Sequence, residues 1–194
     1  MQRVLLVNDT DKPIADLCQA LTEHGYEVLP VVATSRALTE VIKREKPDIV
    51  IVDTESPSRD TLEQLALMHA AAPRPVVMFS HDADQQLIRA AVGAGVTTYV
   101  VDGLAPERLA PILEVALARF AEESRLRQRL AEVELELANR KLIDRAKGLL
   151  MEKRNMTEAQ AYEAMRGQAM KQSVKIAEVA RRIIAMTDLL GKSE

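Results

Sequence analysis

Polar side chains that could bind a metal ion follow several short apolar runs of the sequence. Carboxylate oxygens are the ligands that a hard cation such as Mg²⁺ prefers, and a carboxylate can also attack a phosphoryl group. Asp9, Asp53 and Glu55 are therefore candidate Mg²⁺ ligands, although acidic residues also occur in ordinary solvated turns. The polar residues that follow the runs are Asn8, Asp9, Asp53, Glu55, Ser80 and Asp102.

Five short apolar runs, rich in β-branched residues, must position these side chains. Stretches long enough for a helix lie between the runs, and this alternation predicts a parallel sheet with helices on both faces. We expect a five-stranded, doubly wound α/β domain whose strand ends form the polar site at one edge of the sheet. The runs are Val4–Val7, Val28–Val32, Ile49–Val52, Val76–Phe79 and Tyr99–Val101.

Composition and motifs exclude several classes of protein. The first run is not followed by a glycine-rich phosphate-binding fingerprint, so we expect no nucleotide cofactor. The single cysteine, Cys18, excludes an internal disulfide and a cysteine zinc site. No apolar run approaches the roughly 20 residues of a membrane span, and the chain does not start with a signal-peptide pattern, which together predict a cytoplasmic protein without a membrane partner.

The first 120 residues resemble the receiver domain of two-component response regulators. The resemblance rests on Val-Asn-Asp after the first run, Ile-Val-Ile-Val-Asp ending at Asp53, Phe-Ser ending at Ser80, and Gly-Val-Thr-Thr-Tyr ending at Tyr99. It implies that Asp53 is the phosphoacceptor, that acids after the first strand bind metal, and that Ser80 holds the family's Ser or Thr position.

Two positions depart from the receiver pattern. Asn8 replaces the first of two acids, and Asp102 stands where receiver domains carry a lysine. The first change removes a charge from a site that must neutralise a dication, and the second would repel an acyl phosphate. We therefore expect a binding module that kept the receiver fold, with no cofactor required and Mg²⁺ as the candidate ion, while phosphorylation of Asp53 stays an open alternative.

A long helix is predicted after this domain. Pro106 opens it, and apolar residues then recur at intervals of four, three and four residues, which is the spacing of a coiled-coil seam. We expect this segment to make the chain a homodimer, with packing inside one chain as the alternative. The seam consists of Leu126, Leu130, Val133 and Leu137.

Charge is distributed unevenly along the chain. Residues 1–138 hold 14 Lys and Arg against 22 Asp and Glu, a net charge of −8, whereas residues 139–194 hold 12 against 7, a net charge of +5. Clustered Lys and Arg in a small domain favour a nucleic-acid partner. The same residues can also serve only to keep a helical surface soluble.

Three short helices are predicted in the basic segment. The first, Arg140–Met151, has an apolar stripe that includes Ala146, and Gly148 inside it suggests close approach of another helix or of a ligand backbone. Thr157 and Gln160 have the spacing of a capping box for the second helix. We expect Ser173 to cap the third helix and Gly191 to end it.

The apolar faces of the last two helices are short and built of small residues. We expect Tyr162, the one aromatic residue of the segment, to lie in the core, and Gly148, Met151 and Met170 to serve packing as well. The second helix presents Ala161, Tyr162, Met165 and Ala169, and the third presents Ile176, Ala180, Ile183, Met186 and Leu190.

The amino-acid sequence of this segment resembles that of the ANTAR domain of transcription antitermination regulators. The resemblance rests on Ile-Asp-Arg-Ala-Lys-Gly-Leu-Leu-Met from Ile143, then Ala-Tyr ending at Tyr162, Ala-Met ending at Met170, and Val-Ala ending at Ala180. It implies binding of hairpins in nascent leader RNA, which prevents a terminator from forming. The candidate RNA contacts are Arg145, Lys147, Arg166, Lys171, Gln172 and Lys175.

Further stretches narrow the resemblance to NasT-type nitrate-assimilation antiterminators. They are Tyr-Val-Val-Asp-Gly-Leu from Tyr99, Pro111-Ile112, Ala-Arg-Phe ending at Phe120, and Arg140-Lys141. This resemblance implies a nitrate-sensing partner protein that holds the regulator inactive. It divides the chain into a receiver-like domain, 1–120, a coiled-coil linker, 121–138, and an ANTAR domain, 139–194.

Two other functions stay open on the sequence alone. A DNA-binding response regulator could use a helix-turn-helix in the basic segment, but the third helix starts with mostly apolar residues that offer few groups for reading bases. A protein-interaction or phosphorelay component would use the receiver and the coil, and would leave the basic segment without a role.

Overall fold

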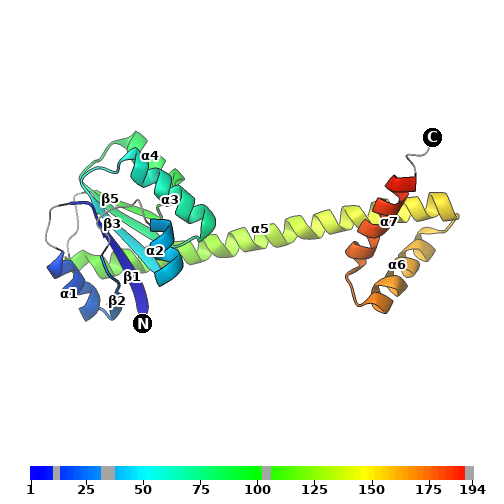
Figure 1. The fold of residues 1–194 in the computed structure, drawn as a ribbon, viewed down its shortest axis with the longest axis horizontal. Coiled ribbons are helices and arrows are strands. Elements are labelled where there is room, and N and C mark those ends of the chain that lie inside the picture. The colour runs from blue at the N-terminus through cyan, green and yellow to red at the C-terminus, as the bar shows by residue number, and fades with distance from the viewer. Residues whose placement is uncertain (11–13, 32–37, 102–105, 191–194) are drawn as a thin grey trace. The chain divides into compact units, whose positions relative to one another are not determined.

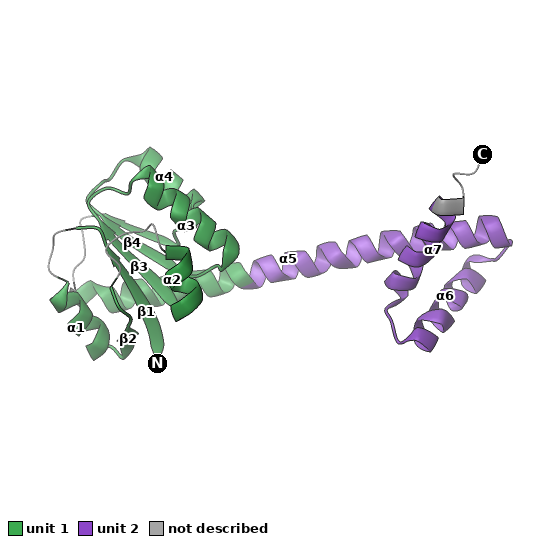
Figure 2. Ribbon diagram, in the orientation of Figure 1, with its two compact units in different colours: residues 1–124 green, residues 125–194 purple. Residues whose placement is uncertain are grey.

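The computed structural model describes residues 1–10, 14–31, 38–101 and 106–190 of the 194-residue chain. It divides into two compact units, residues 1–124 and residues 125–194, each with its own hydrophobic core (Figures 1 and 2). The boundary falls inside one helix, so the three-part division at residues 120 and 138 stays a prediction. Asp102 and Gly191 lie outside the described residues.

The first unit is the predicted five-stranded parallel α/β domain. The sheet has the order β2-β1-β3-β4-β5, and every neighbouring pair of strands is parallel. The strands are β1 (Gln2–Asn8), β2 (Tyr26–Val28), β3 (Ile49–Thr54), β4 (Val76–Ser80) and β5 (Thr98–Val101). The helices between and after them are α1 (Ala15–Glu23), α2 (Leu38–Glu45), α3 (Arg59–Ala71), α4 (Gln85–Gly93) and the start of α5 (Pro106–Arg154).

Helices cover both faces of this sheet because its central strands are apolar on both faces. Leu5 of β1 faces the core formed with α2, α3 and α4, whereas Leu6 faces the core formed with α1 and α5. This alternation follows from the two-residue period of a strand. The predicted fold class is therefore confirmed.

The second strand differs from its prediction. It runs from Tyr26 to Val28 and shares only Val28 with the predicted run 28–32. Tyr26 is buried and lies beside Gln2, while Pro30, which has no N–H to donate, follows soon after the strand ends. The strand starts two residues earlier than predicted because Tyr26, an aromatic residue that precedes the β-branched run, is buried in the sheet.

Helix α5 continues without a break for 49 residues, as the absence of internal glycine before Gly148 suggested. Leu109 and Leu113 are buried against the sheet, as predicted, together with Ala116. Among the residues that the structure describes, no helix combines the length and the apolarity needed to cross a bilayer.

The second unit contains the end of α5, α6 (Glu158–Gln172) and α7 (Ile176–Leu190). The predicted capping box at the start of α6 is confirmed: the Gln160 N–H donates to the Thr157 hydroxyl at 3.3 Å, and the Thr157 N–H donates to Gln160 Oε1 at 2.9 Å. The prediction for Ser173 was wrong. Ser173 has a φ of 53° and ends α6 in the left-handed conformation, and α7 begins only at Ile176.

Candidate nucleic-acid interface and receiver site

The predicted polar residues of the first unit meet at one end of the sheet. Asn8, the last residue of β1, lies beside Asp53 of β3, and the Asp9 N–H donates to the Asp53 carbonyl at 2.9 Å. Thr54, the last residue of β3, lies beside Ser80, the last residue of β4. We call this end of the sheet the polar edge and define it by Asn8, Asp9, Asp53, Glu55 and Ser80.

The acidic side chains of the polar edge differ in environment. Asp53 is buried, whereas Asp9 and Glu55 are exposed. The Asn8 side-chain oxygen accepts hydrogen bonds from the Thr10 hydroxyl at 2.8 Å and the Thr10 N–H at 3.2 Å, so it is engaged by its own loop. Within the described ranges, no three His, Cys, Asp or Glu side chains form a metal-binding group. The Mg²⁺ assignment stays a prediction, and the function proposed below does not use the ion.

Hydrogen bonds join the loops around the polar edge. The Ser80 hydroxyl donates to the Glu55 carbonyl at 2.9 Å and accepts from the Asp82 N–H at 3.1 Å. The Tyr99 hydroxyl of β5 donates to the Asp82 carbonyl at 2.9 Å. Sequence reasoning identified Ser80 but missed Asp82 and Tyr99, because these bonds depend on the path of the loop after β4.

The Asp82 carboxylate is the junction between two of these loops. It accepts a hydrogen bond from the Asp84 N–H at 2.9 Å and another from the Ser56 hydroxyl at 2.8 Å. These two bonds favour the charged form and hold the pKa of Asp82 below its usual value. The loop after β3 and the loop after β4 are thereby tied together.

The three helices of the second unit enclose a small apolar core. Ala146 of α5 is fully buried against Met165 and Ala169 of α6 and against Ala180 of α7, as the predicted stripes required. Small side chains at these positions let the helices approach closely. The predicted inner faces are thus confirmed at their centres, but the prediction for Met186 was wrong, because its side chain is 64% exposed.

The predictions for the margins of this core were wrong. Tyr162 is 42% exposed, Met170 is 72% exposed and Met151 is also exposed, so none of them is a core residue. A Cβ atom at Gly148 would meet nothing within 4 Å, so Gly148 is not a packing device between helices of this chain. Its open surface leaves the other predicted role, the close approach of a ligand backbone, untested.

Two of the candidate RNA contacts form ion pairs that link the helices. The Lys147 Nζ lies 2.8 Å from Asp144 on α5 and 2.7 Å from Glu158 on α6, and its side chain is only 17% exposed. The hydrogen bonds to Asp144 and Glu158 raise the pKa of Lys147, and the bond to Lys147 lowers the pKa of Asp144. Arg145 pairs with Asp188 of α7 at 3.2 Å. Both cations therefore contribute to the packing of the unit.

The remaining candidates lie on α6 and in the turn that follows it. Arg166 pairs with Glu163 at 3.4 Å, and the Gln172 side-chain oxygen accepts a hydrogen bond from Arg182 at 2.5 Å. The side chains of Lys171 and Lys175 are exposed and form no ion pair or hydrogen bond with any residue that the structure describes. Of the six candidates, these two are therefore the most available to a phosphate group.

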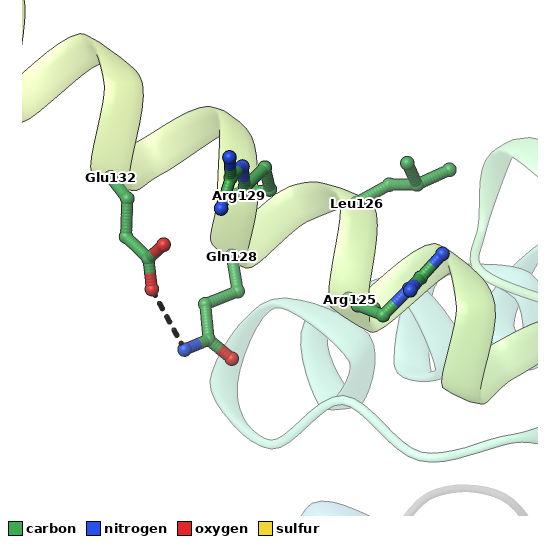
Figure 3. Close-up of a pocket in the computed structure, with 5 residues that line it drawn as sticks. All are labelled: Arg125, Leu126, Gln128, Arg129 and Glu132. Carbon is green, nitrogen blue, oxygen red and sulfur yellow. Dashed lines mark hydrogen bonds between the residues drawn. The ribbon is translucent and has the colours of Figure 1, made fainter.

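The predicted seam lies on an exposed side of α5. Leu126, Leu130, Val133 and Leu137 have exposed fractions between 51% and 60%. Figure 3 shows that Leu126 projects from the opposite side of the helix to Gln128 and Glu132, whose side chains are joined by a 3.0 Å hydrogen bond. The separation of apolar from polar side chains is incomplete, because Leu135, which is 57% exposed, lies about half a helical turn away from the seam residues Val133 and Leu137.

Comparisons with known families cover both units. The response regulator receiver domain matches residues 4–114, and the ANTAR domain matches residues 131–184. The first match covers the sheet and the polar edge, and the second covers the three-helix core and part of the seam. Receiver and ANTAR domains together are characteristic of regulatory proteins rather than enzymes.

Similar proteins and structures agree with these matches. The chain is 31% identical to the transcriptional regulatory protein PdtaR of Mycobacterium tuberculosis over 94% of this chain and 89% of that protein. It is 24% identical to the DNA-binding response regulator MtrA of Mycolicibacterium smegmatis over 73% of this chain and 61% of that protein.

A solved CheY-like receiver domain from Methanospirillum hungatei covers 63% of this chain and 98% of its own, with 26% identity and a TM-score of 0.55. This similarity agrees with the receiver-domain match and supports the fold of the first unit. The chain therefore belongs to the response regulators that combine a receiver domain with a C-terminal ANTAR domain.

Proposed function

We propose that this protein is an RNA-binding regulator of transcription antitermination. Its ANTAR domain would bind hairpins in nascent leader RNA in the cytoplasm and prevent a terminator from forming. The main support is the ANTAR match over residues 131–184, in the basic part of the chain, with similarity to a transcriptional regulatory protein over 94% of the chain. RNA loops present unstacked bases and phosphates that a small helical surface can contact.

Exposed side chains of α6 and the following turn are the best candidates for this contact. Lys171 and Lys175 are free to bind phosphates, and Tyr162 offers an exposed ring on which a base can stack. Arg145, Lys147, Arg166 and Gln172 would first have to exchange the partners described above. Salt-dependent binding is expected because the contacts are largely electrostatic.

Titration separates this function from its rivals. Full-length protein is titrated with a two-hairpin leader RNA and with duplex DNA of equal length at the same salt concentration. Tighter binding to the hairpin RNA supports antitermination. Preference for the duplex would favour a DNA-binding regulator, and indifference to both would favour a protein-interaction role.

The genes under control are proposed to be those of nitrate or nitrite assimilation, with a nitrate-sensing protein as the inhibitory partner. This proposal rests on the resemblance of the sequence around Tyr99, Pro111 and Arg140 to NasT-type antiterminators. A reporter preceded by the leader of a nitrate-assimilation operon tests it: the reporter should respond to nitrate only when both proteins are present. A response that does not need this chain would refute the assignment.

Homodimerisation through the seam is the third part of the proposal. Four exposed apolar residues on one side of a helix are costly in water unless a second helix covers them. Light scattering on the wild type and on Leu130→Glu, with and without RNA, tests the seam. The wild type should be dimeric in at least the RNA-bound state, and the variant monomeric in both.

Phosphorylation of Asp53 remains an alternative means of control. A small phosphodonor with Mg²⁺ should leave the wild type unmodified if the receiver domain acts only as a binding module. Modification of the wild type but not of Asp53→Asn, with a change in RNA affinity, would instead make Asp53 the switch.

A further inference from the structure

An open apolar groove lies between the end of α5 and the second half of α7, inside the ANTAR unit. It has a volume of about 400 Å³. Its floor is apolar, and Met186 at its margin is 64% exposed. The described residues that line it are Leu149, Leu150, Lys153, Arg154, Ile183, Met186 and Thr187.

The groove carries positive charge that the chain does not neutralise. None of its described lining residues is acidic. The Arg154 side chain forms no ion pair or hydrogen bond with the described part of the chain, and the Lys153 side chain pairs only with Glu152, at 3.9 Å. Elsewhere in this unit, Arg145, Lys147 and Arg181 are each paired with a carboxylate. With an apolar lining and two cations that form at most one long ion pair, the groove suits a partner that is both apolar and negatively charged.

The lining chemistry distinguishes between kinds of partner. Arg154 and Lys153 could contact RNA phosphates, but most of the lining is aliphatic: Leu149, Leu150, Ile183 and Met186 offer a base neither an aromatic ring nor a hydrogen-bonding group, and the Thr187 hydroxyl already donates to the Ile183 carbonyl at 2.9 Å. A second copy that docked groove to groove across a two-fold axis would bring two surfaces of the same positive charge together. Neither nucleic acid nor self-association fits the groove well.

We propose that this groove binds an acidic amphipathic helix of a partner protein. Such a helix lays apolar side chains at i, i+3 or i+4, and i+7 into the space between two helices. Met186 can adapt its unbranched side chain to the incoming residues. Carboxylates flanking the apolar stripe of the partner would pair with Arg154 and Lys153. This surface is separate from the proposed RNA contacts, and the proposal does not depend on RNA binding.

The test is a selection of peptides on full-length protein. A displayed library of random peptides of about 18 residues, or five helical turns, is enriched for binding. Selected sequences should combine an apolar stripe of helical period with Asp or Glu on its flanks. A selected peptide should bind the wild type, and its version with the flanking acids changed to Lys should not. Enrichment of sequences without this pattern would overturn the proposal.

Matched variants locate the binding site. Met186→Glu and Arg154→Glu should each weaken the selected peptide by at least about tenfold. Met170→Glu is the control for peptide binding, because Met170 is also largely exposed, on α6, and the charge change is the same. Both methionines are exposed, so both variants should keep the circular dichroism spectrum of the wild type. Binding that survives Met186→Glu and Arg154→Glu would overturn the proposal.

Two further readouts exclude the other occupants. RNA affinity and molar mass should be the same for Met186→Glu as for the wild type. A selective loss of RNA affinity in Met186→Glu would assign the groove to nucleic acid, and a selective change of mass would assign it to a second copy. Either result would overturn the proposal.

Discussion

The polar residues of the two units are held in opposite ways. At and beside the polar edge of the receiver domain, Ser80, Asp82 and Tyr99 are joined to the neighbouring loops by hydrogen bonds of 2.9 to 3.1 Å. In the ANTAR unit, Lys171, Lys175 and the ring of Tyr162 project from a helical surface without such partners. The first arrangement can change only by exchanging bonds, whereas the second is ready to contact another molecule.

The difference suggests a division of labour between the units. A closed hydrogen-bond network can exist in two arrangements, which suits a domain that responds to a signal. An exposed set of cations and one aromatic ring suits a domain that binds an extended, charged partner. Four predictions, ordered from the largest expected effect to the smallest, test this contrast.

The core of the ANTAR unit should be far more sensitive to truncation than its surface. Met165→Ala removes a buried side chain from a small core and should cost about 2 to 5 kcal/mol in unfolding free energy. Met170→Ala, five residues further on α6, should change it by less than about 0.5 kcal/mol. Urea denaturation followed by circular dichroism gives both values. Equal effects would contradict the assignment of inner and outer faces.

The ring of Tyr162 should contribute to RNA binding and not to folding. Tyr162→Ala should weaken binding to a leader hairpin by about 1 to 3 kcal/mol, the usual value for one stacked base. Tyr162→Phe keeps the ring and should bind like the wild type. Fluorescence anisotropy with labelled RNA measures both. If Tyr162→Ala lowers thermal stability and leaves RNA affinity unchanged, the residue belongs to the core after all.

The free and the paired lysines should differ in their salt dependence. Replacing Lys171 and Lys175 by Ala should reduce the slope of log K against log salt by roughly 0.7 to 0.9 for each lost phosphate contact. Lys147→Ala should leave this slope unchanged and should instead weaken the link between α5 and α6. RNA titrations at several salt concentrations measure this slope for each variant. A reduced slope for Lys147→Ala alone would reverse the assignment.

The network at the polar edge should contribute a small, pH-dependent stability. Because the folded state lowers the pKa of Asp82, its contribution is present above the usual value of 3.8 and is lost as the pH falls below it. The difference in denaturation midpoint between wild type and Asp82→Asn should therefore shrink between about pH 6 and about pH 3. The effect is small because the side chain is solvated. A constant difference would exclude charge as its origin.

Sequence patterns predicted the receiver fold well, because burial on both faces forces central parallel strands to be apolar. The same patterns placed Asn8, Asp53 and Ser80 at one edge, since parallel strands end together. The bonds of Asp82 and Tyr99 were not predictable, because they depend on a loop conformation that leaves no periodic pattern.

The helical unit was predicted less completely. Its inner face is built of Ala146, Ala169 and Ala180, which leave a narrow apolar stripe. Larger neighbours such as Tyr162 and Met170 therefore looked like core residues when they are only adjacent to it. The pairing of Lys147 with Glu158 joins two helices across a turn, and the spacing of residues in the sequence does not reveal that contact.

The uninterrupted course of α5 fixes the angular phase between the seam and the ANTAR core, since Leu137 and Ala146 lie on one rigid helix. Each residue turns a helix by about 100°, so inserting one residue between these two positions would rotate the proposed RNA-contacting surface away from the axis of the proposed dimer. Inserting seven residues would restore the phase to within about 20°. In the proposed dimer, the part of α5 between Leu137 and Ala146 could therefore change in length only by whole heptads. Its sequence need only remain helical.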